Sequence, residues 1–342
     1  MARVAAAYPA SAVVGACSLG AMGAGREVQD EPAVALVAAA LPGARARAFR
    51  LGENEADLEA IAGAVVDPGS APKGLVLLGD TWTCDADVLL PVLDEVFPGA
   101  VKVGGLVSAG SRRGATALFV GDKLYTDGLV GLALSGAITI ETVVSQGCRP
   151  IGEPMLVTRS RGHIIDELGK RPPADVLREL FDASGERDRE LLRTALFMAV
   201  ERKKSVHYTP GETVVRNVVG LDPRSGSLAL GAGVADWDVL QFVVRDADAA
   251  HRDWVTRLRA YAGASAARPA GALLFSCAAR GKPLFGEASH DTRLLGEIVG
   301  PVPSAGLFCD GEIGPVGGAS LLHGHTAVAA FFRGESGAPS QS

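Results

Sequence analysis

Cysteine is scarce in this chain, and its cysteines are scattered. Only five occur among 342 residues, and no two of them form a C-x-x-C pair. They are Cys17, Cys84, Cys148, Cys277 and Cys309. An odd number of widely spaced cysteines argues against a disulfide framework and against a zinc module built on four cysteines. The pattern favours a reducing compartment.

Long uninterrupted apolar runs are also missing. The start of the chain, residues 1–25, is apolar, but it is rich in alanine and glycine rather than leucine, carries Arg3 and is interrupted by Pro9. This composition is unlike that of a secretory signal peptide. No later stretch reaches membrane-spanning length without a charge or a glycine break. We therefore expect a cytoplasmic protein with no membrane partner.

An excess of positive charge is absent as well. The 33 basic and 39 acidic residues give a formal net charge of −6. Proteins that bind nucleic acids or anionic membranes usually carry a basic patch or stripe. We therefore expect no nucleic-acid partner.

The common cofactor motifs are lacking too. The sequence has no Walker loop, no dinucleotide fingerprint, no H-E-x-x-H and no C-x-x-C-H for covalent haem. The segment 20–25 resembles a dinucleotide loop only superficially, because no acidic residue ends a second strand at the right distance. We predict no cofactor. A divalent metal, or a non-covalent haem held by His323, His325 or Cys309, remains an open alternative.

The chain is long enough for two domains or one large one. Hydrophobic residues make up 48% of it, so it can bury a substantial core. The Gly/Ser/Pro-rich residues 335–342 are predicted to form a disordered tail.

One pattern occurs three times. Aligned on Gly15, Gly105 and Gly306, the copies read G-x-x-[S/C]-x-G and place Ser18, Ser108 and Cys309 in equivalent positions. We interpret Ser18 and Ser108 as turn residues. An apolar run follows each copy and is predicted to be a strand: residues 33–38, 129–134 and 326–332.

Two of the copies also have matching elements ahead of them. Strand-like runs at 74–78 and 271–275 are each followed by a helix-like stretch, at 85–97 and 290–299. We infer a duplicated unit of strand, helix, strand, glycine turn and strand. The prediction is an α+β (mixed α/β) fold, in which duplicated strand-helix-strand-strand units form two similar halves with mixed sheets and outer helices. The first copy lacks its upstream strand and helix, so its sheet edge needs covering.

The region between the second and third copies has its own succession of elements. Alternation predicts a strand at 138–144, and turn residues predict hairpins near Arg161 and around 222–226. A strand at 240–245 leads to a helix over 247–261 with Asp246 as its cap. Two further helices are predicted over 173–183 and 186–199.

The stretch 305–326 holds the densest set of reactive side chains. Cys309 is either a nucleophile activated by a nearby imidazole or a buried residue where the other copies have serine. Glu312 either binds a ligand ammonium group or acts as a general base, or else it holds the loop together. His323 and His325 are spaced i, i+2, which on one strand puts both rings on one face. This spacing would suit a metal, and its alternative is a hydrogen-bonded histidine beside a cleft.

Three arginines and two neighbours complete the candidates. An arginine among valines is unfavourable to bury unpaired, so Arg216, with Asn217 and with Arg149 in a nearby loop, either reaches a ligand carboxylate or pairs with an acid. Cys277 and Arg280 end the strand 273–277, where α/β sheets place ligand sites; a plain strand end is the alternative.

The sequence resembles the FIST (F-box and intracellular signal transduction) family, which has an N-terminal and a C-terminal half. The resemblance rests on residues 145–154, 214–217, 273–277, 284–286, 308–315 and 322–324, and it covers most of the chain. It implies an N-terminal-like half over 1–140, truncated at its start, and a C-terminal-like half over 141–334. No F-box or kinase segment is present, and His325 stands where many relatives have another residue.

The family resemblance implies a sensor of small intracellular ligands, and amino acids are one class that it suggests. Some bacterial relatives look like haem-based nitric-oxide sensors, and an animal relative joins a ubiquitin ligase. We predict a pocket between the two halves, with Glu312 and Arg216 recognising opposite charges of a small zwitterion or acid. The residues predicted to contact ligand are Arg149, Arg216, Asn217, Cys277, Arg280, Cys309, Glu312, His323 and His325.

Three alternatives remain open. One is an enzyme that uses Cys309, Glu312 and His323, or a metal held by His323 and His325. The second is a haem-based gas sensor. The third is an adaptor that binds a signalling protein, and a homo-oligomer is compatible with each.

Overall fold

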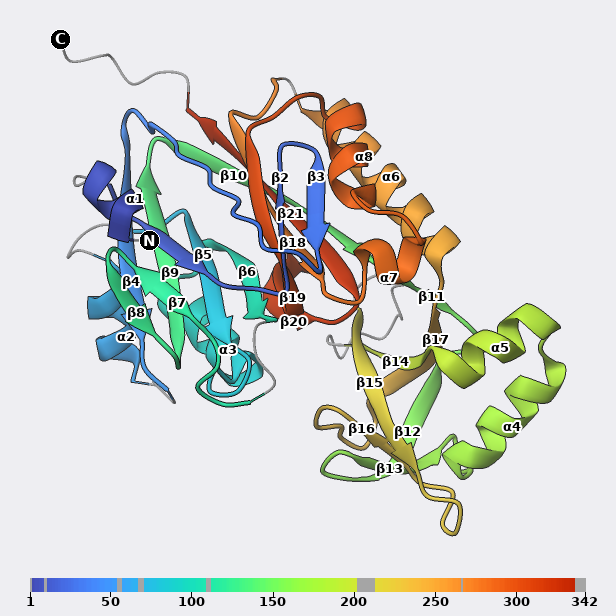
Figure 1. Ribbon diagram of the computed structural model, residues 1–342. Coiled ribbons are helices and arrows are strands. Elements are labelled where there is room, and N and C mark those ends of the chain that lie inside the picture. Colours follow the sequence, from blue (N-terminus) through green and yellow to red (C-terminus); the bar gives the residue numbers. More distant parts are fainter. Residues whose placement is uncertain are drawn as a thin grey trace. The chain divides into compact units, whose positions relative to one another are not determined.

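The computed structural model describes residues 2–8, 11–53, 57–66, 71–108, 112–201, 213–265 and 267–335. The chain forms two compact units that are not consecutive in sequence (Figure 1). The first contains residues 1–145, 254–322 and 326–342, and the second contains residues 146–253 and 323–325. The boundary near 140 that we expected lies close to the first crossing between them. Apart from Glu335, the predicted disordered tail lies outside the described residues.

The first unit is built on an eleven-stranded mixed sheet. Eight strands follow the order β10-β21-β18-β19-β6-β5-β9-β4, and β2, β3 and β20 attach to it through β19 and β2. β5 pairs with β6 and β18 with β19 in parallel, whereas β6 and β19, at the centre, are antiparallel. The strands are β2 (Gly20–Gly23), β3 (Arg26–Gln29), β4 (Ala44–Leu51), β5 (Gly74–Asp80), β6 (Val101–Val107), β9 (Leu129–Gly136), β10 (Ile138–Gln146), β18 (Gly271–Cys277), β19 (Ser304–Val316), β20 (Ala319–His323) and β21 (Thr326–Gly334). This mixture of sheet and helices confirms the α+β class.

The sheet shows the predicted duplication. One copy runs β4-α2-β5-α3-β6-β9 along the chain and the other runs β10-α6-β18-α8-β19-β21. From the sheet centre outward, both have the same strand order, β6-β5-β9-β4 and β19-β18-β21-β10. The helices are α2 (Leu58–Val65), α3 (Ala86–Val96), α6 (Ala247–Ala264) and α8 (His290–Ile298), together with the short α1 (Ala2–Ala7) and α7 (Gly281–Phe285). The two copies therefore share a single sheet.

Alternating apolar residues bury both faces of this sheet. Leu75 and Leu77 of β5 pack with α2 and α3 in one core cluster, whereas Val76 and Leu78 belong to a cluster on the opposite face. That opposite cluster includes residues of a separate three-stranded sheet of β1 (Val14–Ala16), β7 (Leu118–Val120) and β8 (Lys123–Tyr125). Trp254 of α6 and Leu295 of α8 cover the second copy.

The first repeat copy departs from the prediction. Residues 33–38 form no strand. Val34 is 93% exposed and Leu36 57%. Three of these six residues are alanine, which is depleted in strands. Among the described strands, none pairs with this segment. The expected strand at 33–38 is therefore wrong.

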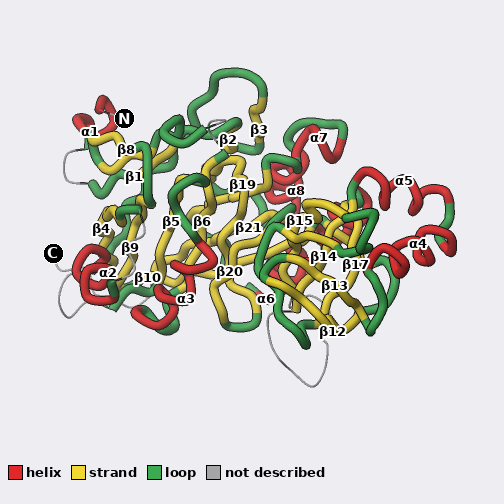
Figure 2. The backbone as a smooth tube through the Cα atoms, turned by 90° about the horizontal axis from the view of Figure 1, so that it is seen from below, coloured by secondary structure: helices red, strands yellow, loops and turns green. Residues whose placement is uncertain are grey.

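The second unit is a closed antiparallel barrel. The order β17-β12-β13-β16-β15-β14 returns to β17 through an additional β17–β14 pairing, and β11 adds to β17. Figure 2 labels β12, β13, β14, β15 and β17 of this unit together with the helices α4 and α5. The elements are β11 (Cys148–Pro150), β12 (Met155–Arg161), β13 (Ile164–Leu168), α4 (Pro173–Ala183), α5 (Glu186–Thr194), β14 (Leu196–Glu201), β15 (Thr213–Leu221), β16 (Leu228–Leu230) and β17 (Val239–Arg245). Closure removes sheet edges that could otherwise pair with another chain.

One predicted helix is too long. The helix expected over 186–199 ends at Thr194, and Leu196–Glu201 is strand β14. Met198 and Val200 of β14 point into the apolar barrel interior. Tertiary pairing with β15 and β17 overrides the helical pattern here. Asp246 caps α6 as predicted, because its Oδ1 accepts the Ala249 N–H at 3.1 Å.

Within the described parts of the chain, we find no helix with the length and apolar character needed to cross a membrane.

Candidate functional site

The repeated glycine motifs meet at the centre of the main sheet. Val107 of β6 pairs with Cys309 of β19 across the centre of the sheet. On either side, Val107 pairs with Asp80 of β5, and Cys309 pairs with Cys277 of β18. The carboxyl ends of β5, β6 and β18 therefore reach one level of the sheet. β6 and β19 are antiparallel, so β18 reaches this level from the direction opposite to β5 and β6. The level is therefore not the shared carboxyl edge at which open parallel sheets bind ligands.

Close approach of the strands explains two glycines of the motif. A Cβ at Gly105 would lie 2.3 Å from Cys309 Sγ, and a Cβ at Gly306 would lie 2.0 Å from the Leu274 carbonyl oxygen. Both distances are too short for any side chain, so the sheet centre requires glycine at these places.

The serines of the first two motif copies form hydrogen bonds to the backbone of the third copy. The Ser18 and Ser108 hydroxyls each donate a hydrogen bond to the Phe308 carbonyl oxygen, both at 2.6 Å. The residue that accepts both bonds comes directly before Cys309. Ser18 and Ser108 therefore do more than form turns, because they join the three motif copies.

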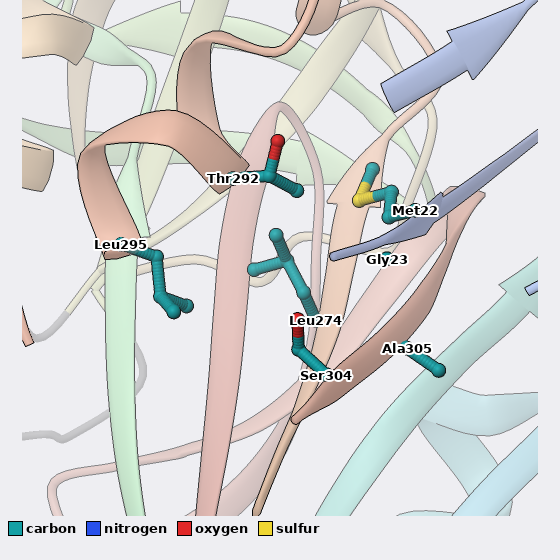
Figure 3. A pocket seen from close by; sticks show the side chains of 7 residues that line it. All are labelled: Met22, Gly23, Leu274, Thr292, Leu295, Ser304 and Ala305. Carbon is teal, nitrogen blue, oxygen red and sulfur yellow. The ribbon is translucent and has the colours of Figure 1, made fainter. Parts of the chain in front are cut away.

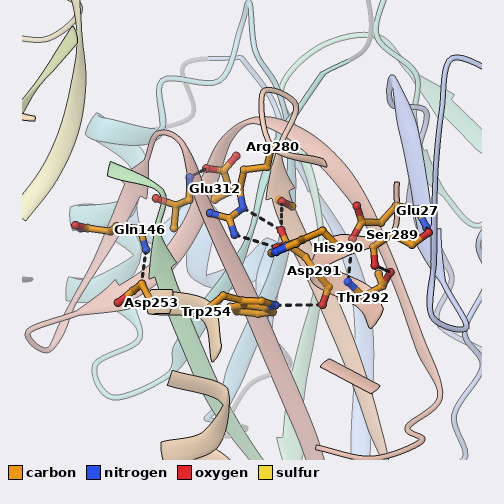
Figure 4. A network of polar contacts seen from close by, with 12 residues as sticks. Glu27, Gln146, Asp253, Trp254, Arg280, Ser289, His290, Asp291, Thr292 and Glu312 are labelled. Atoms are coloured by element: carbon orange, nitrogen blue, oxygen red, sulfur yellow. Dashed lines mark hydrogen bonds and ion pairs between the residues drawn. The ribbon is translucent and has the colours of Figure 1, made fainter. Parts of the chain in front are cut away.

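A fully buried ion pair lies just beyond the end of β18. Arg280 is 0% exposed and Asp291, in the first turn of α8, is 1% exposed. Arg280 Nε and Nη2 donate to the two carboxylate oxygens of Asp291, each at 2.9 Å (Figure 4). Bidentate pairing of this kind is among the strongest side-chain interactions. The third nitrogen, Nη1, has no hydrogen-bond partner among the described residues.

Asp291 takes part in several further hydrogen bonds. Its carboxylate accepts the Ser276 hydroxyl at 3.1 Å and lies 2.9 Å from His290 Nδ1, and its carbonyl oxygen accepts Trp254 Nε1–H at 3.1 Å. Burial by itself raises the pKa of Asp291. The Arg280 charge and the bonds from His290 and Arg280 outweigh burial and hold the pKa below its usual range. Asp291 therefore remains ionised.

Glu312 on β19 is the second buried carboxyl group of the site. It is 0% exposed; Oε2 accepts the Thr326 N–H at 3.1 Å, and Oε1 has no partner in the part of the chain that the structure describes. Figure 4 shows the Arg280 guanidinium between the carboxyl groups of Glu312 and Asp291. Burial raises the pKa of Glu312 well above its ordinary value, and the Thr326 hydrogen bond and then the Arg280 charge offset only part of this.

The raised pKa of Glu312 predicts a pH effect on stability. Between the ordinary value of 4.5 and the raised value, the native state binds a proton that the unfolded state has lost. The free energy of unfolding should therefore fall as pH rises through this window. Glu312→Gln should remove the effect, so the difference in stability between wild type and variant should grow with pH. Urea unfolding at pH 4 to 8 measures it; a difference independent of pH would contradict the prediction.

Cys309 is poorly placed to act as a nucleophile. It is fully buried and lies opposite Cys277 on the paired strands β18 and β19. Burial raises the pKa of the Cys309 thiol well above its ordinary value, and the nearby Glu312 carboxyl adds to this. The thiolate is the nucleophilic form, so the described conformation does not support the nucleophile interpretation.

The expected histidine pair is not formed on one strand. β20 ends at His323, and His325 has φ 58° in the turn before β21. The i, i+2 argument is therefore wrong. The His325 ring lies 4.0 Å from that of Phe197, and its Nε2 is 3.1 Å from Asn217 Oδ1. Burial, with a smaller effect from Arg245, lowers the pKa of His325 to about 4. His325 is therefore neutral at physiological pH.

Arg216 and Asn217 cannot act together. Successive strand residues point to opposite faces, and their partners on β14 are Met198, which lies in the barrel interior, and Phe197. Arg149 is bound within the second unit, where it forms ion pairs with Asp246, at 2.8 Å, and with Asp188.

The nine predicted site residues thus separate into two groups. Cys277, Arg280, Cys309 and Glu312 lie together in the first unit, whereas Arg149, Arg216, Asn217, His323 and His325 belong to the second. The guanidinium that influences the Glu312 pKa is that of Arg280 rather than Arg216. Across the residues described, no group of three or more His, Cys, Asp or Glu side chains is arranged to hold a metal ion.

Sequence reasoning missed Asp291, His290 and Glu27. The stretch 290–299 was predicted as a helix, and an acidic residue in a first helical turn is ordinary. Arg280 was identified as a site residue, but its partner lies eleven residues further along, beyond the short helix α7. Ser289, His290 and Asp291 look like an ordinary helix start, so no signal for this pair was present in the sequence.

A small hollow lies beside the buried network (Figure 3). Its volume is about 10 Å³, which leaves room for at most one water molecule. None of the nine predicted residues lines it. The lining residues are Met22, Gly23, Leu274, Thr292, Leu295, Ser304 and Ala305.

Comparison with known proteins places this architecture in a family. Residues 1–171 match the FIST N domain and residues 173–315 match the FIST C domain. An uncharacterized protein of Mycobacterium tuberculosis H37Rv is 37% identical over 333 residues, which are 97% of this chain and 86% of the relative. An uncharacterized protein of Mycobacterium bovis is 39% identical over 323 residues, 94% of this chain and 83% of the relative.

These matches define a sensory protein of signal transduction, because that is the class to which FIST domains belong. The chain belongs to the FIST family and carries both its N and its C domain.

Proposed function

We propose that this protein senses a small zwitterionic or acidic molecule, an amino acid or a small carboxylate, at the centre formed by Arg280 and Glu312. One observation carries the proposal. A fully buried guanidinium and a fully buried carboxyl group lie close together, and each keeps one polar atom without a hydrogen-bond partner among the described residues.

Unpartnered buried polar atoms are unusual in folded proteins. Leaving one unsatisfied costs roughly 1–3 kcal/mol, and more for a charged group. Arg280 Nη1 and Glu312 Oε1 are of opposite character, since the first can only donate and the second accepts when ionised. The two side chains influence each other electrostatically without the N···O approach within 4.0 Å that defines an ion pair.

The head of an amino acid has the complementary groups. Its carboxylate would accept from Arg280 Nη1, and its ammonium group would donate to Glu312 Oε1. A ligand ammonium would also favour the ionised form of Glu312, which burial alone disfavours. A simple carboxylate would use Arg280 only. The enzyme alternative has weaker support, because Cys309 is buried and its thiol pKa is raised.

Isothermal titration against amino acids and small carboxylates tests the proposal. We expect heat with at least one amino acid. Glu312→Gln should weaken amino-acid binding by about 10- to 100-fold, the loss of a charged hydrogen bond, and should leave simple carboxylates less affected. Asp310→Asn, which changes a neighbouring carboxylate that is exposed, is the matched control. Absence of heat with every compound, or an affinity unchanged by Glu312→Gln, would rule out the proposed ligand class.

A cytoplasmic location is part of the same proposal. All five cysteines are free, which is usual in a reducing compartment. The signalling protein that receives the output, or a second copy of the chain, remains a prediction.

A further inference from the structure

We propose that the β2–β3 hairpin, residues 20–29, is a strap over the Arg280–Glu312 centre that must lift to admit the ligand. The inference rests on the proposed function, because it concerns access to the same centre. Arg280, Asp291 and Glu312 are each at most 1% exposed. A small molecule can reach them only if some element that covers them moves.

The hairpin is attached next to both members of the buried ion pair. Gln29 Oε1 accepts the N–H of Lys282, two residues after Arg280, at 3.1 Å. Glu27 Oε1 accepts the N–H of Thr292, directly after Asp291, at 2.8 Å. These two acceptors are two residues apart on β3 and so point to the same side of the strand.

Strand β3 thus bridges the helices that carry the pair. Arg280 is the N-terminal flanking residue of α7, and Asp291 is in the first turn of α8. The Ser289 hydroxyl, just ahead of α8, accepts the Glu27 N–H at 3.0 Å. Glu27 therefore contacts the start of α8 through both its backbone and its side chain.

Glu27 forms hydrogen bonds to the start of α8, but its carboxyl group lies close to the negative charge of Asp291. Its carboxyl group is buried, and Oε2 has no partner within the described ranges. Burial and then the negative charge of Asp291 raise the pKa of Glu27. Burying one carboxyl group close to another weakens the contact.

The hairpin is also held by strand pairing and by the buried side chain of Met22, which is 1% exposed and belongs to the core cluster that contains Leu274 and Phe308. β2 pairs with β19 over three residues, Ala21–Gly23 against Ala305–Leu307, and β3 pairs only with β2. The hollow of Figure 3 lies between β2 and α8, with Met22 and Gly23 on one side and Thr292 and Leu295 on the other. The hairpin is therefore not fully packed against the helix that it covers.

Hydrogen exchange measured by mass spectrometry on the full chain tests the strap. Glu27→Ala removes the fastening and should speed exchange in peptides covering 20–29 by about tenfold or more, since local opening follows the stability of the local contacts. Peptides from β5 and from the barrel should exchange as in wild type. Glu27→Gln keeps the acceptor for Thr292 N–H and removes the repulsion with Asp291, so its hairpin should exchange no faster than in wild type.

The matched control is Asp85→Ala. Asp85 caps α3, because its Oδ1 accepts the Val88 N–H at 3.2 Å. Its removal should speed exchange in α3 but not in the hairpin. The strap would be overturned if Glu27→Ala left the hairpin at the wild-type rate, opened it only together with the whole sheet, or had the same effect as Glu27→Gln.

The ligand separates this inference from the proposed function. An amino acid that binds wild type should associate faster with Glu27→Ala, by about tenfold, in stopped-flow measurements. Local opening in Glu27→Ala without binding of any amino acid or carboxylate would support the strap and refute the ligand. Binding with an association rate unchanged in Glu27→Ala would support the ligand and refute the strap.

Discussion

Replacing Asp291 with alanine is expected to lower the free energy of unfolding by about 3–5 kcal/mol. The variant keeps the fully buried Arg280 guanidinium but removes both oxygens that accept its Nε and Nη2 bonds. An uncompensated buried charge is among the most destabilising changes known, and domains are stable by only about 5–15 kcal/mol in total. Urea denaturation followed by circular dichroism measures the change.

The control is an ion pair of the same kind at the surface. Arg187 and Asp248 pair at 2.7 Å, with side chains 65% and 61% exposed. Asp248→Ala should lower the free energy of unfolding by no more than about 1 kcal/mol, because solvent screens the charges of an exposed ion pair. A cost of Asp291→Ala as small as that of Asp248→Ala would show that Arg280 finds other compensation, such as water.

The second large effect is expected at a buried lysine. Lys102 of β6 is 1% exposed, and its Nζ donates to the Phe97 carbonyl oxygen at 2.7 Å and pairs with Asp94 at 2.8 Å. Asp94 also accepts the backbone N–H and the hydroxyl of Ser320. Asp94→Ala should lower the free energy of unfolding by about 3 kcal/mol. This value is at the low end for a broken buried ion pair, because the Asp94 side chain is 30% exposed.

A rescue variant makes this prediction specific. Adding Lys102→Met to Asp94→Ala removes the stranded charge and should recover part of the loss, since apolar replacements of buried ion pairs are often near neutral. A double variant less stable than Asp94→Ala alone would mean that the bond from Lys102 to Phe97 matters more than the charge. Thermal and urea unfolding of the two variants together decide between these outcomes.

Local patterns were sufficient to predict the repeated unit of the fold. The G-x-x-[S/C]-x-G motif, the strand-like runs before it and the helix starts all reflect short-range geometry, and the glycines at 105 and 306 are required by strands that approach closely. That both copies join one sheet through β6 and β19 depends on pairing between distant residues. Local patterns do not encode such pairing.

The sequence was sufficient to predict which residue types form the site, but not how these residues are arranged in space. Arg280, Cys309 and Glu312 were identified because arginine, cysteine and glutamate are conspicuous among apolar residues. Their burial depends on the layers above the sheet, and for Cys309 it favours the buried-residue alternative over the nucleophile. The assumption that His323 and His325 share a strand failed because a turn residue with φ 58° lies between β20 and β21.

The position of β21 bears on how the chain is made. β10 hydrogen-bonds only to β21 within the sheet, and the whole barrel is synthesised between them. A nascent chain therefore holds β10 without its partner in the sheet until β21 leaves the ribosome. Pairing between such distant segments is slow, and an open edge invites aggregation. Truncation before Thr326 should consequently leave the earlier strands soluble only with the help of a chaperone.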